Sequence, residues 1–167
     1  MIQSLIISGL SIAFRLAQVV FEMRKEKLGL CGYLKSLIEM GAGLPLRAIT
    51  NSTIAKLDIG IELIPAQVQS LASALKHNTS LKVVNLEQFQ WKKESIEWDL
   101  RNKNLTDQDM LIVAELLKKN TALNKLNLVG NKIADKGCEH LSPALAKMTA
   151  LKELHFGDNK IADKGCE

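Results

Sequence analysis

The chain has few aromatic side chains and few cysteines. Phe, Trp and Tyr make up 4% of its 167 residues although 47% of the residues are hydrophobic, so we expect a core built mainly from aliphatic side chains. Its three cysteines cannot all pair, and they show neither a CxxC motif nor zinc-finger spacing, which argues against a structural metal site. This usage of cysteine predicts a reduced compartment, the cytoplasm.

The sequence also lacks the short motifs of common catalytic and nucleotide-binding sites. It contains no GxxxxGK(S/T), GxGxxG, HExxH or GxSxG pattern, and its three histidines, His77, His140 and His155, are scattered along the chain. Its net charge of +4 includes no basic block of the kind that binds nucleic acid. We therefore predict no enzyme: no catalytic residues, cofactor, metal or small-molecule substrate, and no nucleic-acid partner.

What the chain does contain is a repeat. Residues 131–139 and residues 159–167 both read NKIADKGCE, a perfect match at a shift of 28 residues. The match extends upstream as the pattern LxxLxLxxNxI. The corresponding positions are Leu123 and Leu151, Leu126 and Leu154, Leu128 and Phe156, Asn131 and Asn159, and Ile133 and Ile161. A fixed period in the twenties with this leucine spacing is typical of a leucine-rich repeat solenoid.

The pattern predicts a structural role for each position of the repeat. Leu126 and Leu128 alternate along a short strand, so both should face inward. The side-chain amide of Asn131 should bond to the backbone of the adjoining coil, because a buried turn would otherwise leave polar groups unpaired. Gly137 lies near the start of the following helix, where its small size permits close packing.

An earlier copy of the repeat precedes these two. Trp98, Leu100 and Leu105 continue the pattern backward by 28 residues, but Lys103 stands where asparagine is expected. A helix should follow over residues 107–120, with Thr106 and Asp107 as suitable caps. Acidic residues recur at the expected helix starts with the same 28-residue spacing, at Asp107, Asp135 and Asp163.

Two further copies are predicted closer to the N-terminus. Their strands should lie within residues 54–59 and 81–86, and a helix should connect them over residues 65–78. These copies are degenerate, because Glu62 and Phe89 replace the asparagine.

The repeat spacing breaks between Val84 and Trp98, which are 14 residues apart, half a period. This interval is too short for a strand, a helix and a return, so residues 87–95 are predicted to form an insertion or a hairpin. Phe89 and Trp91 lie in this segment. Two interpretations of it stay open: a protruding contact element, or a strand that covers an otherwise open part of the core.

These repeats resemble the ribonuclease-inhibitor-like class of leucine-rich repeats, which includes the recognition domains of NOD-like receptors and the GTPase-activating protein of Ran. The resemblance covers residues 95–167 best, extends over 50–94 and fades over 1–49. It implies an α/β horseshoe solenoid with a parallel sheet on the concave side and helices on the convex side. The arginine-bearing loops of the Ran activator do not map onto this chain.

The two ends of the chain fit the repeat least well. Residues 1–50 are predicted to be a degenerate N-terminal repeat or cap, followed by leucine-rich repeats over 51–167. The apolar residues 1–21 could also be a membrane helix or a signal peptide, but Arg15 would fall mid-span, where a charge is costly. Because the chain stops at Glu167, where a helix should form, we expect a fragment of a longer array.

The residues between the inward-facing leucines should line the concave face. Stacked repeats place them in a polar strip of mixed charge, in which Glu97 and Asp99 are expected to pair with Lys125 across strands. Such a strip suits a protein partner better than a lipid or a nucleic acid. The predicted partner-binding residues are Glu97, Asp99, Arg101, Lys125, Asn127, Val129, Glu153 and His155.

The sequence therefore predicts a non-catalytic scaffold that binds a partner protein through the concave face. Two alternatives stay open. One is a regulator of an enzyme, such as a GTPase activator or an enzyme inhibitor. The other is a membrane-attached sensor ectodomain that depends on residues 1–21.

Overall fold

A computed structural model of the chain describes residues 55–59 and 62–162. The expectations for residues 1–50, including the three interpretations of residues 1–21, therefore lie outside the described residues. Within the described ranges, no helix combines the length and the apolar character that crossing a membrane requires.

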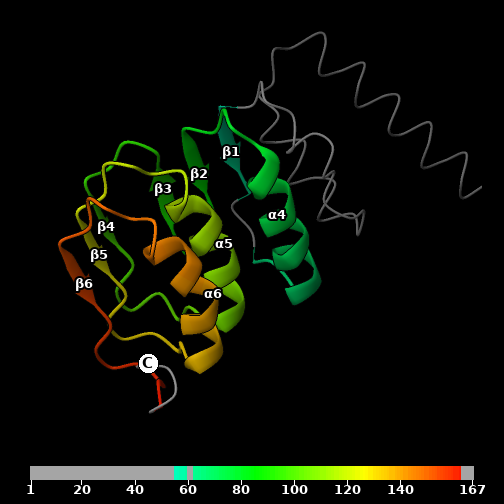
Figure 1. Cartoon of the computed structure of the whole chain (residues 1–167). Coiled ribbons are helices and arrows are strands. Elements are labelled where there is room, and N and C mark those ends of the chain that lie inside the picture. Colours follow the sequence, from blue (N-terminus) through cyan, green and yellow to red (C-terminus); the bar gives the residue numbers. More distant parts are fainter. Residues whose placement is uncertain (1–54, 60–61, 163–167) are drawn as a thin grey trace, which may run out of the picture.

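Short strands and helices alternate along the described chain, with the strands on one side and the helices on the other (Figure 1). Helices α4, α5 and α6 pack side by side in sequence order. This arrangement agrees with an α/β repeat protein. The elements are β1 (Lys56–Asp58), α4 (Pro65–His77), β2 (Val83–Asn85), β3 (Gln90–Lys92), β4 (Glu97–Asp99), α5 (Asp107–Leu117), β5 (Lys125–Asn127), α6 (Asp135–Leu145) and β6 (Glu153–His155).

The strands form two three-stranded sheets rather than one. β1 pairs in parallel with β2, and β2 pairs antiparallel with β3. The second sheet, β4–β5–β6, is parallel throughout, as the repeat predicts. The antiparallel strand β3 is the physical reason for the division, because it takes the position beside β2 that the next repeat strand would otherwise occupy.

The core lies between the strands and the helices and is built from the inward-facing repeat positions. Trp98, Leu126 and Leu154 face one another across β4, β5 and β6. Leu126 and Leu128 are fully buried, which confirms the predicted alternation, but Leu154 on the last described strand is 41% exposed. A leucine at this position therefore depends on a neighbour on each side for its full burial.

The predicted role of Asn131 is confirmed in detail. Its Nδ2 donates hydrogen bonds to the carbonyl oxygens of Leu100 (2.9 Å) and Leu128 (2.8 Å). Its Oδ1 accepts hydrogen bonds from the backbone N–H groups of Lys103 (3.1 Å) and Leu105 (3.0 Å). One buried side chain thus satisfies polar groups of two successive coils.

Asn159 repeats this arrangement one repeat later. Its Nδ2 donates to the carbonyl oxygens of Leu128 and Phe156, both at 2.9 Å, and its Oδ1 accepts from Ile133 N–H at 3.1 Å. We call Asn131 and Asn159 together the asparagine ladder. It links each coil to the one before it, and Lys103 occupies the position where a further member would stand.

The helix starts are capped in two different ways. At α5, Asp109 Oδ2 accepts hydrogen bonds from Thr106 N (2.7 Å) and Thr106 Oγ1 (2.8 Å), so the predicted cap at Thr106 is present. At α6 the cap position is Ala134, whose side chain cannot accept a hydrogen bond. Asp107 of the preceding repeat replaces it, because its Oδ1 accepts from Ala134 N–H (2.7 Å) and Gly137 N–H (3.0 Å).

The segment 87–95 contains β3, which pairs antiparallel with β2 just before the segment, so the predicted hairpin is present. Phe89 and Trp91 are buried, so the interpretation of the segment as a protruding element built on its aromatic side chains is wrong. The segment instead covers the core. Phe89 packs edge-on against Trp98 with ring centroids 5.5 Å apart, and Trp98 Nε1 donates a hydrogen bond to the Gln90 carbonyl oxygen at 2.9 Å.

Candidate functional site

The open face of β4–β6, the side turned away from the helices, carries the predicted partner-binding residues. Strand register places six of these side chains in two rows. One row is Glu97, Lys125 and Glu153, and the other is Asp99, Asn127 and His155. We call these six residues the β4–β6 grid. All six are exposed or half-buried, as are the adjoining Arg101 and Val129, whereas the residues between them on β4 and β5 are buried.

One ion pair in the grid differs from the prediction. Lys125 Nζ lies 2.9 Å from Glu153 Oε2, so Lys125 pairs with the strand after it rather than with Glu97 or Asp99 on the strand before it. Glu97 lies directly beside Lys125 in the register and acts on it only through a weaker charge effect. The expected pairing was wrong because register alone does not say on which side a long lysine side chain finds its partner.

The ion pair also shifts the ionisation of both groups. The hydrogen bond from Lys125 lowers the pKa of Glu153, and a second contact, from His155 Nε2 at 3.4 Å, lowers this pKa further. The same hydrogen bond to Glu153 raises the pKa of Lys125. Glu153 therefore stays negatively charged, and Lys125 positively charged, over a wider pH range than the isolated side chains would.

A second ion pair forms at the C-terminal end of β4, between Asp99 and Arg101. The Arg101 side chain donates three hydrogen bonds to Asp99, from Nε to Oδ1 at 3.0 Å and to Oδ2 at 3.1 Å, and from Nη2 to Oδ2 at 2.8 Å. These hydrogen bonds lower the pKa of Asp99 and raise that of Arg101. Because both side chains are 56% exposed, the pair orders a charged surface without stabilising the core.

The grid presents fixed, accessible charges of both signs on a rigid support. Such a surface can recognise the charge pattern of another macromolecule, and its ordered ion pairs lower the entropy lost on binding. Among the described residues, no group of three or more His, Cys, Asp or Glu side chains gathers as a metal site would require.

The face of the other sheet also carries polar side chains and was only partly foreseen. Lys56, Val83 and Lys92 share one row across β1, β2 and β3. The second row is tied by hydrogen bonds, from Asn85 Nδ2 to Asp58 Oδ2 at 3.3 Å and from Gln90 Nε2 to Asn85 Oδ1 at 2.7 Å. Sequence reasoning missed the residues of β3 because they do not follow the repeat. The alternation of aromatic and polar residues over 89–92 is the sequence signal that could have found them.

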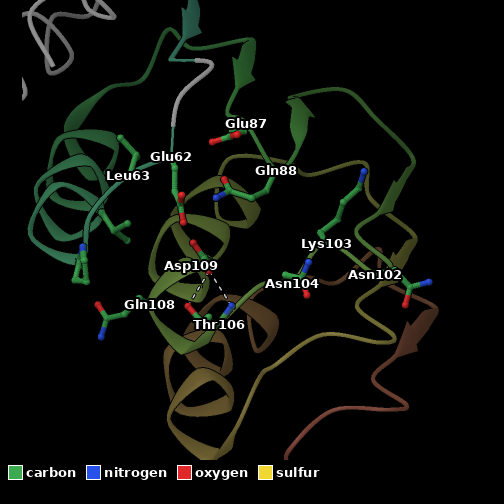
Figure 2. Close-up of a pocket in the computed structure, with 12 residues that line it drawn as sticks. Glu62, Leu63, Glu87, Gln88, Asn102, Lys103, Asn104, Thr106, Gln108 and Asp109 are labelled. Atoms are coloured by element: carbon green, nitrogen blue, oxygen red, sulfur yellow. Dashed lines mark hydrogen bonds between the residues drawn. The ribbon is translucent and has the colours of Figure 1, made fainter. Parts of the chain in front are cut away.

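An open cavity of about 590 Å³ lies between the N-terminal ends of α4 and α5 (Figure 2). Two features explain the gap. Lys103 interrupts the asparagine ladder there, and Pro65, the first residue of α4, cannot cap the next helix as Asp107 does. None of the predicted partner-binding residues lines the cavity. Its lining is Glu62, Leu63, Pro65, Val68, Glu87, Gln88, Asn102, Lys103, Asn104, Thr106, Gln108 and Asp109.

The backbone around Lys103 adopts an unusual conformation. Asn102 and Asn104, on either side, have φ angles of +55° and +56°, in the left-handed region that asparagine enters more readily than most residues. Figure 2 shows Glu62 and Gln88 directed toward Asp109 across the cavity. Asp109 is held by its hydrogen bonds to Thr106, so the acidic wall of the cavity is partly fixed.

Comparison with known proteins agrees with the repeat geometry. A family model described as a leucine rich repeat matches residues 119–142 and 147–167. The matched segments contain the strands β5 and β6 and most of α6, and therefore support four of the six residues of the β4–β6 grid. Leucine-rich repeats commonly serve in protein interaction.

No curated protein matches the chain. Among solved structures, the chain is similar to one titled leiomodin-1 actin-binding site 2, with a TM-score of 0.40 and 22% sequence identity. The match covers 72% of this chain and 65% of that chain.

Proposed function

We propose that this chain is a non-catalytic scaffold that binds a partner protein through the β4–β6 grid. The observation that carries the proposal is the grid itself: six accessible polar side chains stand in two rows on strands whose other side is the core. Two of the supporting strands belong to segments that match the leucine-rich repeat. We further propose that the repeats belong to the ribonuclease-inhibitor-like class, that the grid faces the concave side of a horseshoe, and that the protein works in the cytoplasm.

The proposal is tested by affinity capture with a matched pair of variants. Glu97→Lys reverses an exposed charge of the grid, and within the described residues Glu97 takes part in no ion pair. Glu139→Lys makes the same change at an exposed position of α6. We expect a specific partner to be captured by the wild type and by Glu139→Lys and to be lost with Glu97→Lys. Capture that is unaffected by Glu97→Lys, Asp99→Lys and Glu153→Lys would place the interface elsewhere.

The competing hypothesis is regulation of an enzyme through the same face. The captured partner separates the two: if it is a GTPase or another enzyme, its rate is measured with and without this chain. An acceleration or inhibition that disappears with Glu97→Lys would replace the scaffold by a regulator. Carbonate extraction of membranes tests the cytoplasmic assignment, because a resistant membrane pellet would support the sensor alternative.

A further inference from the structure

The sheet β1–β3 carries a row of side chains with a charge pattern unlike that of the β4–β6 grid. Lys56, Val83 and Lys92 lie side by side across three strands. The two lysines are exposed and Val83 between them is half-buried. The row is therefore cationic at both ends and apolar in the middle, whereas the matching row of the grid is acidic, basic and acidic.

More positive charge surrounds the end of this row at Lys92. An open cavity of about 370 Å³ is lined by Lys82, Val83, Lys92, Lys93, Glu94 and Ser95, so Glu94 is its single acidic residue. Lys82 and Lys93 are exposed, and their backbones are joined by a hydrogen bond from Lys93 N–H to the Lys82 carbonyl oxygen at 2.8 Å. We call Lys56, Lys82, Lys92 and Lys93 the lysine face.

These charges are not neutralised within the described part of the chain. None of the four lysines of the lysine face takes part in an ion pair there. Residues 1–54 contain six Lys and Arg but only three Glu and no Asp, so the sequence of this segment also carries a net positive charge. Complementary negative charge is therefore best supplied by another molecule.

The spacing of the row points to the form of that molecule. Neighbouring strands lie about 4.8 Å apart, so the backbones at Lys56 and Lys92 are separated by roughly 10 Å with Val83 between them. In an α-helix, residues seven positions apart share one face about 10.5 Å apart, and residues three or four positions along lie between them. An acidic residue at each end and an apolar residue between would match the row.

We propose that the lysine face binds an acidic amphipathic helix of a partner protein, with carboxylates on Lys56 and Lys92 and an apolar side chain on Val83. A nucleic acid is a poorer match, because the aromatic side chains Phe89 and Trp91 are buried and offer no surface for base stacking. The lysine face lies on a different sheet from the grid, so this proposal does not depend on the proposed function.

The test uses a labelled helical peptide of about four turns. It has Glu at two positions seven apart, and Leu at the positions three and four residues after the first Glu. Its reference peptide has Gln in place of both Glu residues. We expect the full chain to bind the acidic peptide, as followed by fluorescence anisotropy, and to lose affinity as salt is added. Lys56→Glu and Lys92→Glu should each weaken binding by about tenfold or more.

Lys136→Glu is the matched control, because Lys136 is equally exposed on α6 and lies on neither sheet. Unchanged thermal melting of all three variants shows that they fold. Equal loss in Lys92→Glu and Lys136→Glu would overturn the proposal, as would equal binding of the Gln peptide. So would tighter Lys92-dependent binding of an oligonucleotide or of vesicles containing anionic lipid than of the acidic peptide.

Discussion

The carboxylate of Asp107 both caps the helix that contains Gly137 and requires that residue to be glycine. Asp107 Oδ1 accepts a hydrogen bond from Gly137 N–H at 3.0 Å. A Cβ atom on Gly137 would lie 2.6 Å from the same oxygen and 2.6 Å from Ile133 Cγ2. Asp107 at the start of one helix thus caps the helix of the next repeat. An aspartate at a helix start therefore holds neighbouring repeats together as well as marking where its own helix begins.

Replacing Asp107 should therefore destabilise the following helix. We expect Asp107→Ala to lower the free energy of unfolding by about 1–2 kcal/mol, because Ala134 and Gly137 lose their shared acceptor. Asp107→Asn keeps an acceptor oxygen and should cost less. Urea denaturation measures both changes. Equal losses for the two variants would show that the carboxylate, rather than the hydrogen-bond geometry, carries the effect.

Gly137→Ala should destabilise the protein although alanine favours helices. The added Cβ meets Asp107 and Ile133 at distances that force a shift, which costs roughly 1–3 kcal/mol and outweighs a propensity gain of about 1 kcal/mol. In a double-mutant cycle the loss should shrink when Asp107 is already alanine, since one of the two clashes is gone. Additive losses would mean that Ile133 alone sets the cost.

Equivalent leucines should differ in importance along the stack. Leu126→Ala should cost about 2–5 kcal/mol because its side chain is fully buried and a cavity remains. Leu154→Ala should cost clearly less, since 41% of Leu154 is already exposed. Asn127→Ala, on the open face beside Leu126, should change stability by about 0.5 kcal/mol or less. The reverse order in urea melts would shift the inward and outward assignment by one residue.

The two buried tryptophans should respond differently to loss of the indole N–H. Trp98 Nε1 is bonded to the Gln90 carbonyl, whereas the Trp91 Nε1 atom has no hydrogen-bond partner among the described residues. We expect Trp98→Phe to cost about 1–2 kcal/mol more than Trp91→Phe, because only the former breaks a hydrogen bond. Thermal melts compare the two, and equal costs would show that Trp91 has a partner outside the described ranges.

The ionisation of Glu153 should depend on Lys125. Its lowered pKa means that the contribution of this group to stability is present above the ordinary glutamate pKa of about 4.3 and is lost as the pH falls through the lowered value. Lys125→Met should raise the Glu153 pKa toward its ordinary value, and His155→Ala should raise it by less. A carboxyl NMR titration measures both shifts. A larger effect from His155 would reverse the ranking.

The parts of the fold that follow the repeat could be predicted from the sequence. Leucine spacing placed Leu126 in the core, and the asparagine at position 131 was correctly expected to bond to the adjoining coil. These predictions succeed because the same local packing problem recurs in every coil, so its solution recurs in the sequence.

The features that the sequence could not predict depend on contacts between different repeats or on a departure from them. The cap from Asp107 to Gly137 joins residues 30 positions apart, and although a hairpin was predicted over residues 87–95, the break in the spacing did not say which residues of β3 would pair with β2. The Lys125–Glu153 pair depends on which of two neighbours a flexible side chain reaches. A periodic pattern identifies the face on which such residues lie and leaves their partners open.

The antiparallel strand β3 divides the strands into two blocks, β1–β3 and β4–β6, which are joined in a different way from the repeats within each block. Strands β3 and β4 belong to separate sheets, so side chains carry the join, through the packing of α4 against α5, the Phe89–Trp98 ring contact and side-chain hydrogen bonds such as that of Trp98. Apolar contacts weaken on cooling more than hydrogen-bonded ladders do. At low temperature, therefore, the molecule should first lose its rigidity at this join, while each block keeps its own structure.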